Sequence, residues 1–294
     1  MLTLYVAVLM LLPLTAPLAI KHQSARRAVI GNCVRIISVG ATIAASPAIA
    51  ASPATAARAP TMDIFERLTT TDSQKFEPPK PLMTAPDIFY PSWLTGRWSA
   101  SSTTTSVTAP CSIALFGGQR LYERAAAEIG SSLEYECRFV PYEGGAVADR
   151  AFNVESIARA SMGTLSVDQI DATPNKIHSV LKPKDSGGRF TVDILIEGRT
   201  TETIGSTFVT DEIGTNVLKS EFKDQANLVS LKRVETISSY ELVENGLVMG
   251  KQKTITFLEP SNDPTSRETT FFMMSNGRAV DVRTYDVVYR QKER

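Results

Sequence analysis

The sequence predicts a mainly β domain, an antiparallel meander of strands that closes into a barrel with about two short helices. From residue 165 to the C-terminus, strand-rich runs follow one another without a long helical period. Phe190, Val192 and Ile194 alternate with polar residues, as a half-buried strand requires. Nine or ten strands paired in sequence must close or fold over to protect their edges. Tight-turn pairs, of which Asn-Gly favours a type I′ hairpin, separate the runs: Gly187-Gly188, Asn245-Gly246 and Asn276-Gly277.

The elements are expected in the following order. Residues 62–74 can form a short helix, and the prolines of residues 77–81 then impose an extended strap, because proline fixes φ and lacks a donor. The two main helices are expected at 119–129 and at 153–162, the second capped by Asn153 and ended by Gly163. Strands are expected at residues 98–107, 133–140, 176–181, 190–196, 200–210, 217–224, 228–243, 247–258, 268–274 and 279–290.

Residues 1–60 read as a targeting region ahead of the domain. An apolar run, a short basic stretch without acids, and a second apolar run ending at small residues resemble a signal, a transit segment and a second signal in series. This address indicates the plastid thylakoid lumen, by either the general secretory or the twin-arginine route; the alternative is a single membrane anchor. We therefore expect removal of 1–60, a helix and strap at 61–90, and a barrel domain at 91–294.

Composition excludes several classes of function. Residues 1–50 hold four of the 31 Lys and Arg and no Asp or Glu, so 27 basic groups face 31 acidic groups in the remainder, a net charge of −4. A nucleic-acid-binding protein would show a basic excess instead. After removal of the targeting region only His178 remains, which leaves little material for a histidine nucleophile or metal centre.

Two cysteines of the mature chain leave two alternatives open. In the lumen, Cys111 and Cys137 could form one disulfide, worth about 3 kcal/mol in the chain-entropy model. The other alternative is a pair of free thiols. Without further clustered ligands they do not make a zinc site, and no metal or cofactor is expected.

Catalytic motifs are absent from the mature sequence. No G-x-S-x-G elbow and no P-loop spacing occurs, and Glu134/Glu136 and Asp211/Glu212 are neighbours by number only. The protein is therefore expected not to be an enzyme. The densest polar group is Asp149, Arg150 and Asn153, which serves either as a contact for a partner or simply as the entry to a helix.

Two resemblances add to this interpretation. The segment Leu94 to Trp98 resembles the G-x-W opening strand of lipocalins, which implies a barrel whose end is closed by Trp98 under an arginine, here Arg283 or Arg290. The stretches Pro86 to Trp98, Leu115 to Gly118, Arg138 to Tyr142 and Val147 to Asn153 are similar to an uncharacterised cyanobacterial and plastid domain family. That resemblance spans about residues 80–292, implies the plastid address and supplies no mechanism.

Three functions follow as hypotheses. The first is a non-catalytic auxiliary or assembly protein that contacts a photosynthetic membrane complex, through the proline strap and residues 147–153. The second is a lipocalin-like carrier of a pigment, quinone or lipid, and the third is an enzyme acting on such a ligand. The carrier would line its cavity with residues that otherwise fill a core: Trp98, Phe190, Val192, Ile194, Phe208, Phe257, Phe271 and Tyr285.

Overall fold

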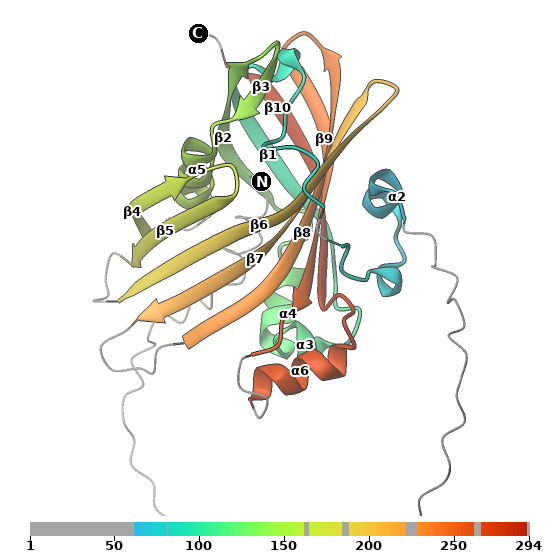
Figure 1. Ribbon diagram of the computed structural model, residues 1–294, viewed down its shortest axis with the longest axis vertical. Helices are drawn as coiled ribbons and strands as arrows, with labels where there is room; N and C mark the ends of the chain where they lie inside the picture. The colour runs from blue at the N-terminus through green and yellow to red at the C-terminus, as the bar shows by residue number, and fades with distance from the viewer. Residues whose placement is uncertain are drawn as a thin grey trace, which may run out of the picture. The chain divides into compact units, whose positions relative to one another are not determined.

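The computed structural model describes residues 62–80, 82–161, 165–183, 188–221, 228–261 and 266–292. The expected targeting region and Gly187 of the first predicted turn lie outside them. The described residues form a ten-stranded antiparallel sheet, curved into a half-barrel (Figure 1). Its strands are β1 (Gly96–Thr108), β2 (Ser132–Tyr142), β3 (Gly145–Ala148), β4 (Leu165–Ala172), β5 (Lys176–Pro183), β6 (Arg189–Ile204), β7 (Thr207–Glu221), β8 (Leu228–Glu244), β9 (Leu247–Leu258) and β10 (Asp281–Gln291).

The strand order is that of an up-and-down barrel with one interruption. Strands consecutive in sequence pair with each other, and β10 returns to pair with β1, where Ala100 lies opposite Tyr289. The sheet order begins at β3 and ends at β4, and between these two strands the described residues contain no pairing. The predicted meander is thus confirmed, whereas the structure opens at this seam instead of closing into a barrel.

Helix α5 (Arg150–Ser161) occupies the seam and replaces the missing strand contact. It packs against both β2 and β4 (Figure 1). Because β3 is only four residues long, it pairs with β2 no further than Phe139. Beyond that point the N–H groups of Glu136 and Arg138 donate to Ser156 Oγ (2.9 Å) and Asn153 Oδ1 (2.7 Å) of the helix. Side chains of α5 therefore satisfy an edge that a further strand would otherwise cover.

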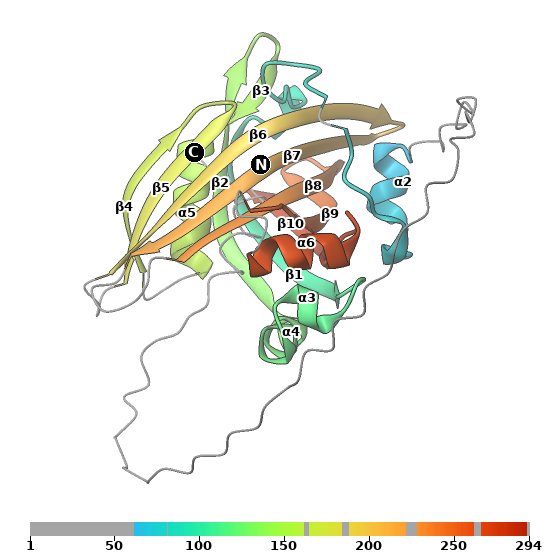
Figure 2. The same ribbon diagram turned by 60° about the horizontal axis from the view of Figure 1, so that its bottom comes forward.

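Both main predicted helices are present, as α4 (Gln119–Ala126) and α5. The possible helix near residue 62 is α2 (Ile64–Thr69), and two unpredicted helices are α3 (Ile113–Phe116) and α6 (Arg267–Ser275). Short 3-10 turns occur at η1 (Ser73–Lys75) and η2 (Ser92–Leu94). Figure 2 shows α3, α4 and α6 near one end of the sheet and α2 apart from them.

The strand predicted at 268–274 is wrong, because this segment forms α6. Ser266 Oγ accepts the N–H of Thr269 (3.1 Å), and Asn276 ends the helix with a left-handed φ of 50°. Caps at both ends outweigh the strand preference of the residues between them. The predicted turn at Asn276-Gly277 is accordingly a helix end. Asn245-Gly246 does join two strands, but only Gly246 has a positive φ, so the hairpin is not of type I′.

The two faces of the sheet carry separate apolar clusters. The concave, inner cluster joins residues of the strands with the apolar side of α5, including Trp98, Tyr240 and Ile157. The outer cluster lies beneath α2 and includes Leu68, Ile237 and Phe257. Residues 82–90 also belong to the domain, since Met83 bridges to Arg199 and Tyr90 to Ala146.

Candidate functional site

Most of the residues predicted to line a cavity lie together on the inner face. Trp98, Phe190, Val192, Ile194, Phe208 and Tyr285 are buried members of the inner cluster. Phe257 instead belongs to the outer cluster, because the alternation of β9 places it on the face of Ile255. Phe271 lies on α6 and is also away from the inner face.

The lipocalin-like pairing of Trp98 with a late arginine is absent. Trp98 is fully buried and its Nε1 donates to the carbonyl oxygen of Leu94 (2.7 Å). Arg283 lies opposite Val107 at the other end of β1, where it pairs with Asp281. Arg290 is exposed. The tryptophan is therefore held by backbone and apolar contacts.

The polar group at the start of α5 is built into the fold. Asp149 accepts the N–H of Phe152 (3.1 Å) and pairs with Arg138. Asn153 is buried and also donates through Nδ2 to the carbonyl oxygen of Arg138 (3.0 Å). Arg150 is buried as well. The interpretation of these residues as a helix entry thus matches their contacts, and Arg150 and Asn153 offer no surface to a partner.

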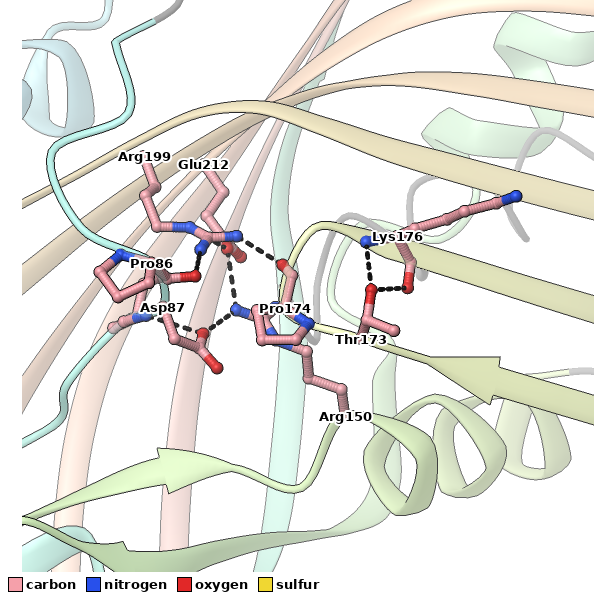
Figure 3. Close-up of polar contacts among 9 residues, drawn as sticks. Pro86, Asp87, Arg150, Thr173, Pro174, Lys176, Arg199 and Glu212 are labelled. Atoms are coloured by element: carbon pink, nitrogen blue, oxygen red, sulfur yellow. Dashed lines mark hydrogen bonds and ion pairs between the residues drawn. The ribbon is translucent and has the colours of Figure 1, made fainter.

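Arg150 belongs to a buried ionic cluster with Asp87, Arg199 and Glu212, here called the arginine–carboxylate cluster (Figure 3). Arg150 Nη2 donates to Glu212 Oε1 (3.1 Å) and to Asp87 Oδ1. Arg199 Nε lies 3.4 Å from Glu212 Oε1. The cluster ties together the strap, α5, β6 and β7.

A β-bulge explains why Arg199 points inward. The register of β6 against β7 shifts between Ile196 and Gly198, which places Arg199 opposite the inward-facing Glu212. Such bulges redirect side chains. The guanidinium then donates to the carbonyl oxygens of Pro86 and Pro174, so it fastens both the strap and the β4–β5 turn to the sheet (Figure 3).

The electrostatics keep Arg150 and Glu212 ionised. Burial alone would raise the pKa of Glu212, but its charged surroundings, foremost the guanidinium of Arg150, bring it below its usual value. Burial alone would lower the pKa of Arg150, yet Glu212 and Asp87 raise it overall. Two guanidinium groups therefore face two carboxylates in this cluster.

Several polar atoms of the inner face have no partner among the described residues. They include Nε and Nη1 of Arg150, both amide atoms of Asn216 and Oγ1 of Thr236. All three side chains are buried, with Asn216 only 4% exposed, and Asn216 lies opposite Ile194 in the sheet. An unpartnered buried polar group costs about 1–3 kcal/mol, so such a group calls for a water or a ligand. We name the inner face around Arg150, Asn216, Thr236 and Ile194 the inner wall.

A pocket lies on the outer face between residues 68–76 and strands β1, β9 and β10. It has a volume of about 430 Å³ and is lined by hydroxyl and apolar groups and by Lys253. Lys253 Nζ donates to the carbonyl oxygens of Arg67 (2.8 Å) and Thr70 (2.7 Å). Burial, reinforced by Arg67, lowers the pKa of Lys253 to about 8. The lysine thus anchors α2 to the sheet.

Carboxylates also meet beneath α2. Arg67 pairs with Glu235 through Nε (2.6 Å) and Nη2 (2.5 Å). Asp211 lies opposite Ile237, a member of the outer cluster, so it faces the same side of the sheet as Glu235 and the side opposite to that of Glu212. Burial, together with Glu235, raises the pKa of Asp211 well above its usual value. Asp211 and Glu212 are adjacent in sequence but therefore belong to two different sites.

The disulfide alternative is wrong, because Cys111 and Cys137 are both free. Cys137 lies opposite Trp98, whereas the chain reaches Cys111 only after the far end of β1. Cys111 Sγ lies 3.7 Å from the carbonyl oxygen of Ser275. A disulfide requires Cα atoms within about 7 Å, and ten residues of strand span about 33 Å.

The described ranges contain neither a cluster of metal ligands nor a membrane-spanning helix. No group of three or more His, Cys, Asp or Glu side chains there is arranged to hold a metal ion. Within the same ranges, no helix is both long and apolar enough to cross a membrane.

Sequence reasoning missed three members of the arginine–carboxylate cluster: Asp87, Arg199 and Glu212. From the sequence, Asp87 stands out only as part of the stretch Pro86 to Trp98. Glu212 stands out only as the neighbour of Asp211. The charged residues within the long strand-forming runs could have indicated such a cluster. A charged side chain in a strand either faces solvent or is paired with an opposite charge in the interior.

The comparisons with known proteins agree with the extent of this domain. A family model described as a domain of unknown function, DUF6816, matches residues 83–293. No curated protein and no solved structure matches the chain. The matched range includes the strap from Met83 onward and all ten strands, so the chain belongs to the DUF6816 family.

Proposed function

We propose that the half-barrel is a non-catalytic carrier that holds a hydrophobic molecule with a polar head, such as a pigment, quinone or lipid, against its inner wall. The observation that supports this proposal is the set of buried polar atoms of Arg150, Asn216 and Thr236 that have no partner in the described part of the chain, beside an apolar cluster. An amphipathic ligand would satisfy both kinds of surface at once. The address expected from residues 1–60 makes the thylakoid lumen the proposed location.

The chemistry of the arginine–carboxylate cluster favours binding over catalysis. Guanidinium groups do not exchange protons near neutral pH, and the lowered pKa of Glu212 keeps it ionised. A general acid or base needs a pKa close to the working pH. The cluster is therefore suited to holding and orienting a ligand.

A second candidate function is an auxiliary or assembly protein for a photosynthetic membrane complex. It is favoured by exposed apolar side chains on the surface, Met273 and Met274 on α6 and the stacked rings of Phe89 and Tyr142. The strap no longer supports it, because residues 84–90 are bound to the sheet through Thr84 and Tyr90. Deletion of the strap would remove buried Ile88 and Tyr90, so it tests folding before it tests partner binding.

The deciding experiment is gentle isolation of the tagged protein from thylakoids. Proteins and organic-extractable molecules in the eluate are then identified together by mass spectrometry. A stoichiometric lipid-like molecule supports the carrier. Photosynthetic subunits without a small molecule contradict it and support the second candidate.

Two adjacent residues provide a matched pair of variants. Ile194 is fully buried on the inner wall, whereas the next side chain, Leu195, is 53% exposed. Ile194→Trp should fill the binding space and reduce the retained ligand, and Leu195→Trp should leave it unchanged. Equal retention by both variants would contradict a ligand on the inner wall.

A further inference from the structure

The pocket on the outer face, here called the outer pocket, is rich in hydroxyl groups. Eight of its sixteen lining residues are serine or threonine. Its volume of about 430 Å³ falls within the usual range of small-molecule sites, roughly 300–1,000 Å³. Both its size and its lining therefore suit a small polar ligand.

The roof of the outer pocket, residues 68–76, is fixed at both ends. At one end Lys253 donates to the carbonyl oxygen of Thr70 (2.7 Å). At the other end the carbonyl oxygen of Phe76 accepts the N–H of Ala279 (3.2 Å), and the Phe76 side chain is buried. The pocket is therefore preformed, so that a ligand does not have to order its roof.

A β-bulge shapes the floor of the outer pocket. The register of β1 against β10 shifts between Thr104 and Ser106, so that the consecutive residues Thr105 and Ser106 both reach Thr284. Oγ1 of Thr284 lies 2.7 Å from Oγ1 of Thr105 and 2.6 Å from Oγ of Ser106. These three hydroxyl groups meet on the sheet and are called the hydroxyl cluster.

The donors and acceptors of the hydroxyl cluster indicate what it can bind. Its two internal hydrogen bonds use two of the three O–H groups, which leaves one donor and most of the acceptor lone pairs. An inorganic anion only accepts hydrogen bonds, and Lys253, the buried lysine of the lining, already donates to two carbonyl oxygens. The hydroxyl groups of a ligand both donate and accept, so they match the cluster.

One carboxylate and one ammonium group complete the lining. Asp286 in β10 lies opposite Lys251 in β9, and both exposed side chains line the outer pocket. The carboxylate accepts O–H groups and the ammonium donates to oxygen atoms, which hydroxyl groups on neighbouring carbons satisfy together. Leu68 and Val282 provide apolar surface for the C–H groups of the same molecule.

We propose that the outer pocket binds a neutral, polyhydroxylated ring of the sugar class, whose hydroxyl groups bond to the hydroxyl cluster, to Asp286 and to Lys251. Such a ring occurs both as a free sugar and as the head of a glycolipid. This site is independent of the proposed carrier function, because the two lie on opposite faces of the sheet.

The first test titrates the protein with methyl β-glucoside and methyl β-galactoside in a calorimeter. At least one glycoside should bind saturably. Its permethylated derivative keeps the ring but has no O–H group to donate to Asp286, so it should bind about tenfold more weakly or worse. Inorganic sulfate should also bind more weakly than the glycoside. Binding of neither glycoside, or tighter binding of sulfate, overturns the sugar class.

Variants locate the site on the outer face. Asp286→Ala should weaken glycoside binding about tenfold or more, and Thr284→Val, which removes the central hydroxyl, should weaken it about threefold or more. The matched controls Glu134→Ala and Thr203→Val change exposed residues outside the pocket and should leave binding unchanged. Equal affinity of all four variants overturns the assignment to this pocket.

Hydrogen exchange measured by mass spectrometry gives a readout that needs no variant. Saturating glycoside should slow exchange in residues 68–76, which form the roof, and leave exchange in β5 unchanged. Saturable binding without any protection of the roof also overturns the assignment.

A flotation experiment separates the two sources of the ring. Phosphatidylcholine vesicles are prepared with and without a monohexosyl diacylglycerol. Binding to the glycolipid vesicles alone, with displacement by free glycoside, supports the site and identifies a lipid head as its ligand. Binding of the glycoside without binding to either vesicle supports the site and identifies a free sugar.

Discussion

Oε1 of Glu212 in β7 accepts a hydrogen bond of 3.1 Å from Nη2 of Arg150, the first residue of α5, although the two residues are 62 positions apart. This contact joins the helix in the β3–β4 opening to the middle of the sheet. It also holds the guanidinium whose remaining donors face the inner wall. The stability of the fold and the proposed binding site therefore depend on the same side chain.

Arg150→Met should lower the free energy of unfolding by about 3–5 kcal/mol, because it leaves the buried Glu212 without a partner. The matched control is Arg159→Met on the same helix, whose ion pair with Glu155 is exposed. The control should lose less than about 1 kcal/mol. Urea denaturation of the two variants measures the difference, and equal losses would contradict the assigned contact.

Glu212 should make the protein less stable in acid. Its pKa is lowered in the folded state, so it stabilises the fold above its unfolded pKa of about 4.3, and this contribution is lost as the pH falls through the folded value. Urea denaturation from pH 7 to pH 3 should show a decline below about pH 4 in the wild type. The decline should be smaller in Glu212→Gln and unchanged in the exposed control Glu155→Gln.

Asp211 should behave in the opposite way. Its pKa is raised by burial and by Glu235, so its ionised form destabilises the fold as the pH rises through the folded value. Asp211→Asn should therefore be more stable than the wild type at pH 7–8, and the gain should vanish below about pH 3.9. A loss of stability at neutral pH would show that the carboxylate has an ionic role.

Lys253→Met should detach α2 while the sheet stays intact. The variant removes the two hydrogen bonds that Nζ donates to the carbonyl oxygens of Arg67 and Thr70. Hydrogen exchange measured by mass spectrometry should become faster in residues 64–70 and unchanged in β1 and β10. Lys251→Met, an exposed neighbour in the same strand, serves as the control.

The two domain cysteines should differ in reactivity. In a Cys33→Ser background, iodoacetamide should modify Cys111, which is partly exposed, and spare Cys137 until the protein is denatured. Burial raises the pKa of the Cys137 thiol, which further slows its reaction. A mass two units below that of the dithiol form would indicate a disulfide and contradict this result.

The strand pattern could be predicted from the sequence because alternation and turn residues are local signals. Even so, the predicted strand at 200–210 spans the turn at Gly205 and Ser206, which separates β6 from β7. Helix α6 was missed because β-favouring residues fill its interior, and only the caps at Ser266 and Asn276 reveal it. The opening between β3 and β4 could not be predicted, because it depends on long-range hydrogen bonds. In these bonds the side chains of Asn153 and Ser156 in α5 accept N–H groups of β2.

The site was predicted only in its apolar part. Alternation placed Trp98, Phe190, Ile194 and Phe208 on one face, and the inner cluster contains them. The arginine–carboxylate cluster depends on a bulge at Ile196 that reverses the side on which Arg199 lies. A one-residue register shift of this kind leaves no clear mark in a single sequence.

The pairing of β1 with β10 places the first and the last strand of the domain side by side, and the unpaired edges fall at β3 and β4, in its interior sequence. A circular permutant follows directly. With a linker from the end of β10 to the start of α2, which keeps residues 62–95 ahead of β1, and with new termini in the segment between α5 and β4, every strand after the first would still follow its sheet neighbour along the chain. The natural order of the strands along the chain is thus only one of at least two orders that this sheet can accept.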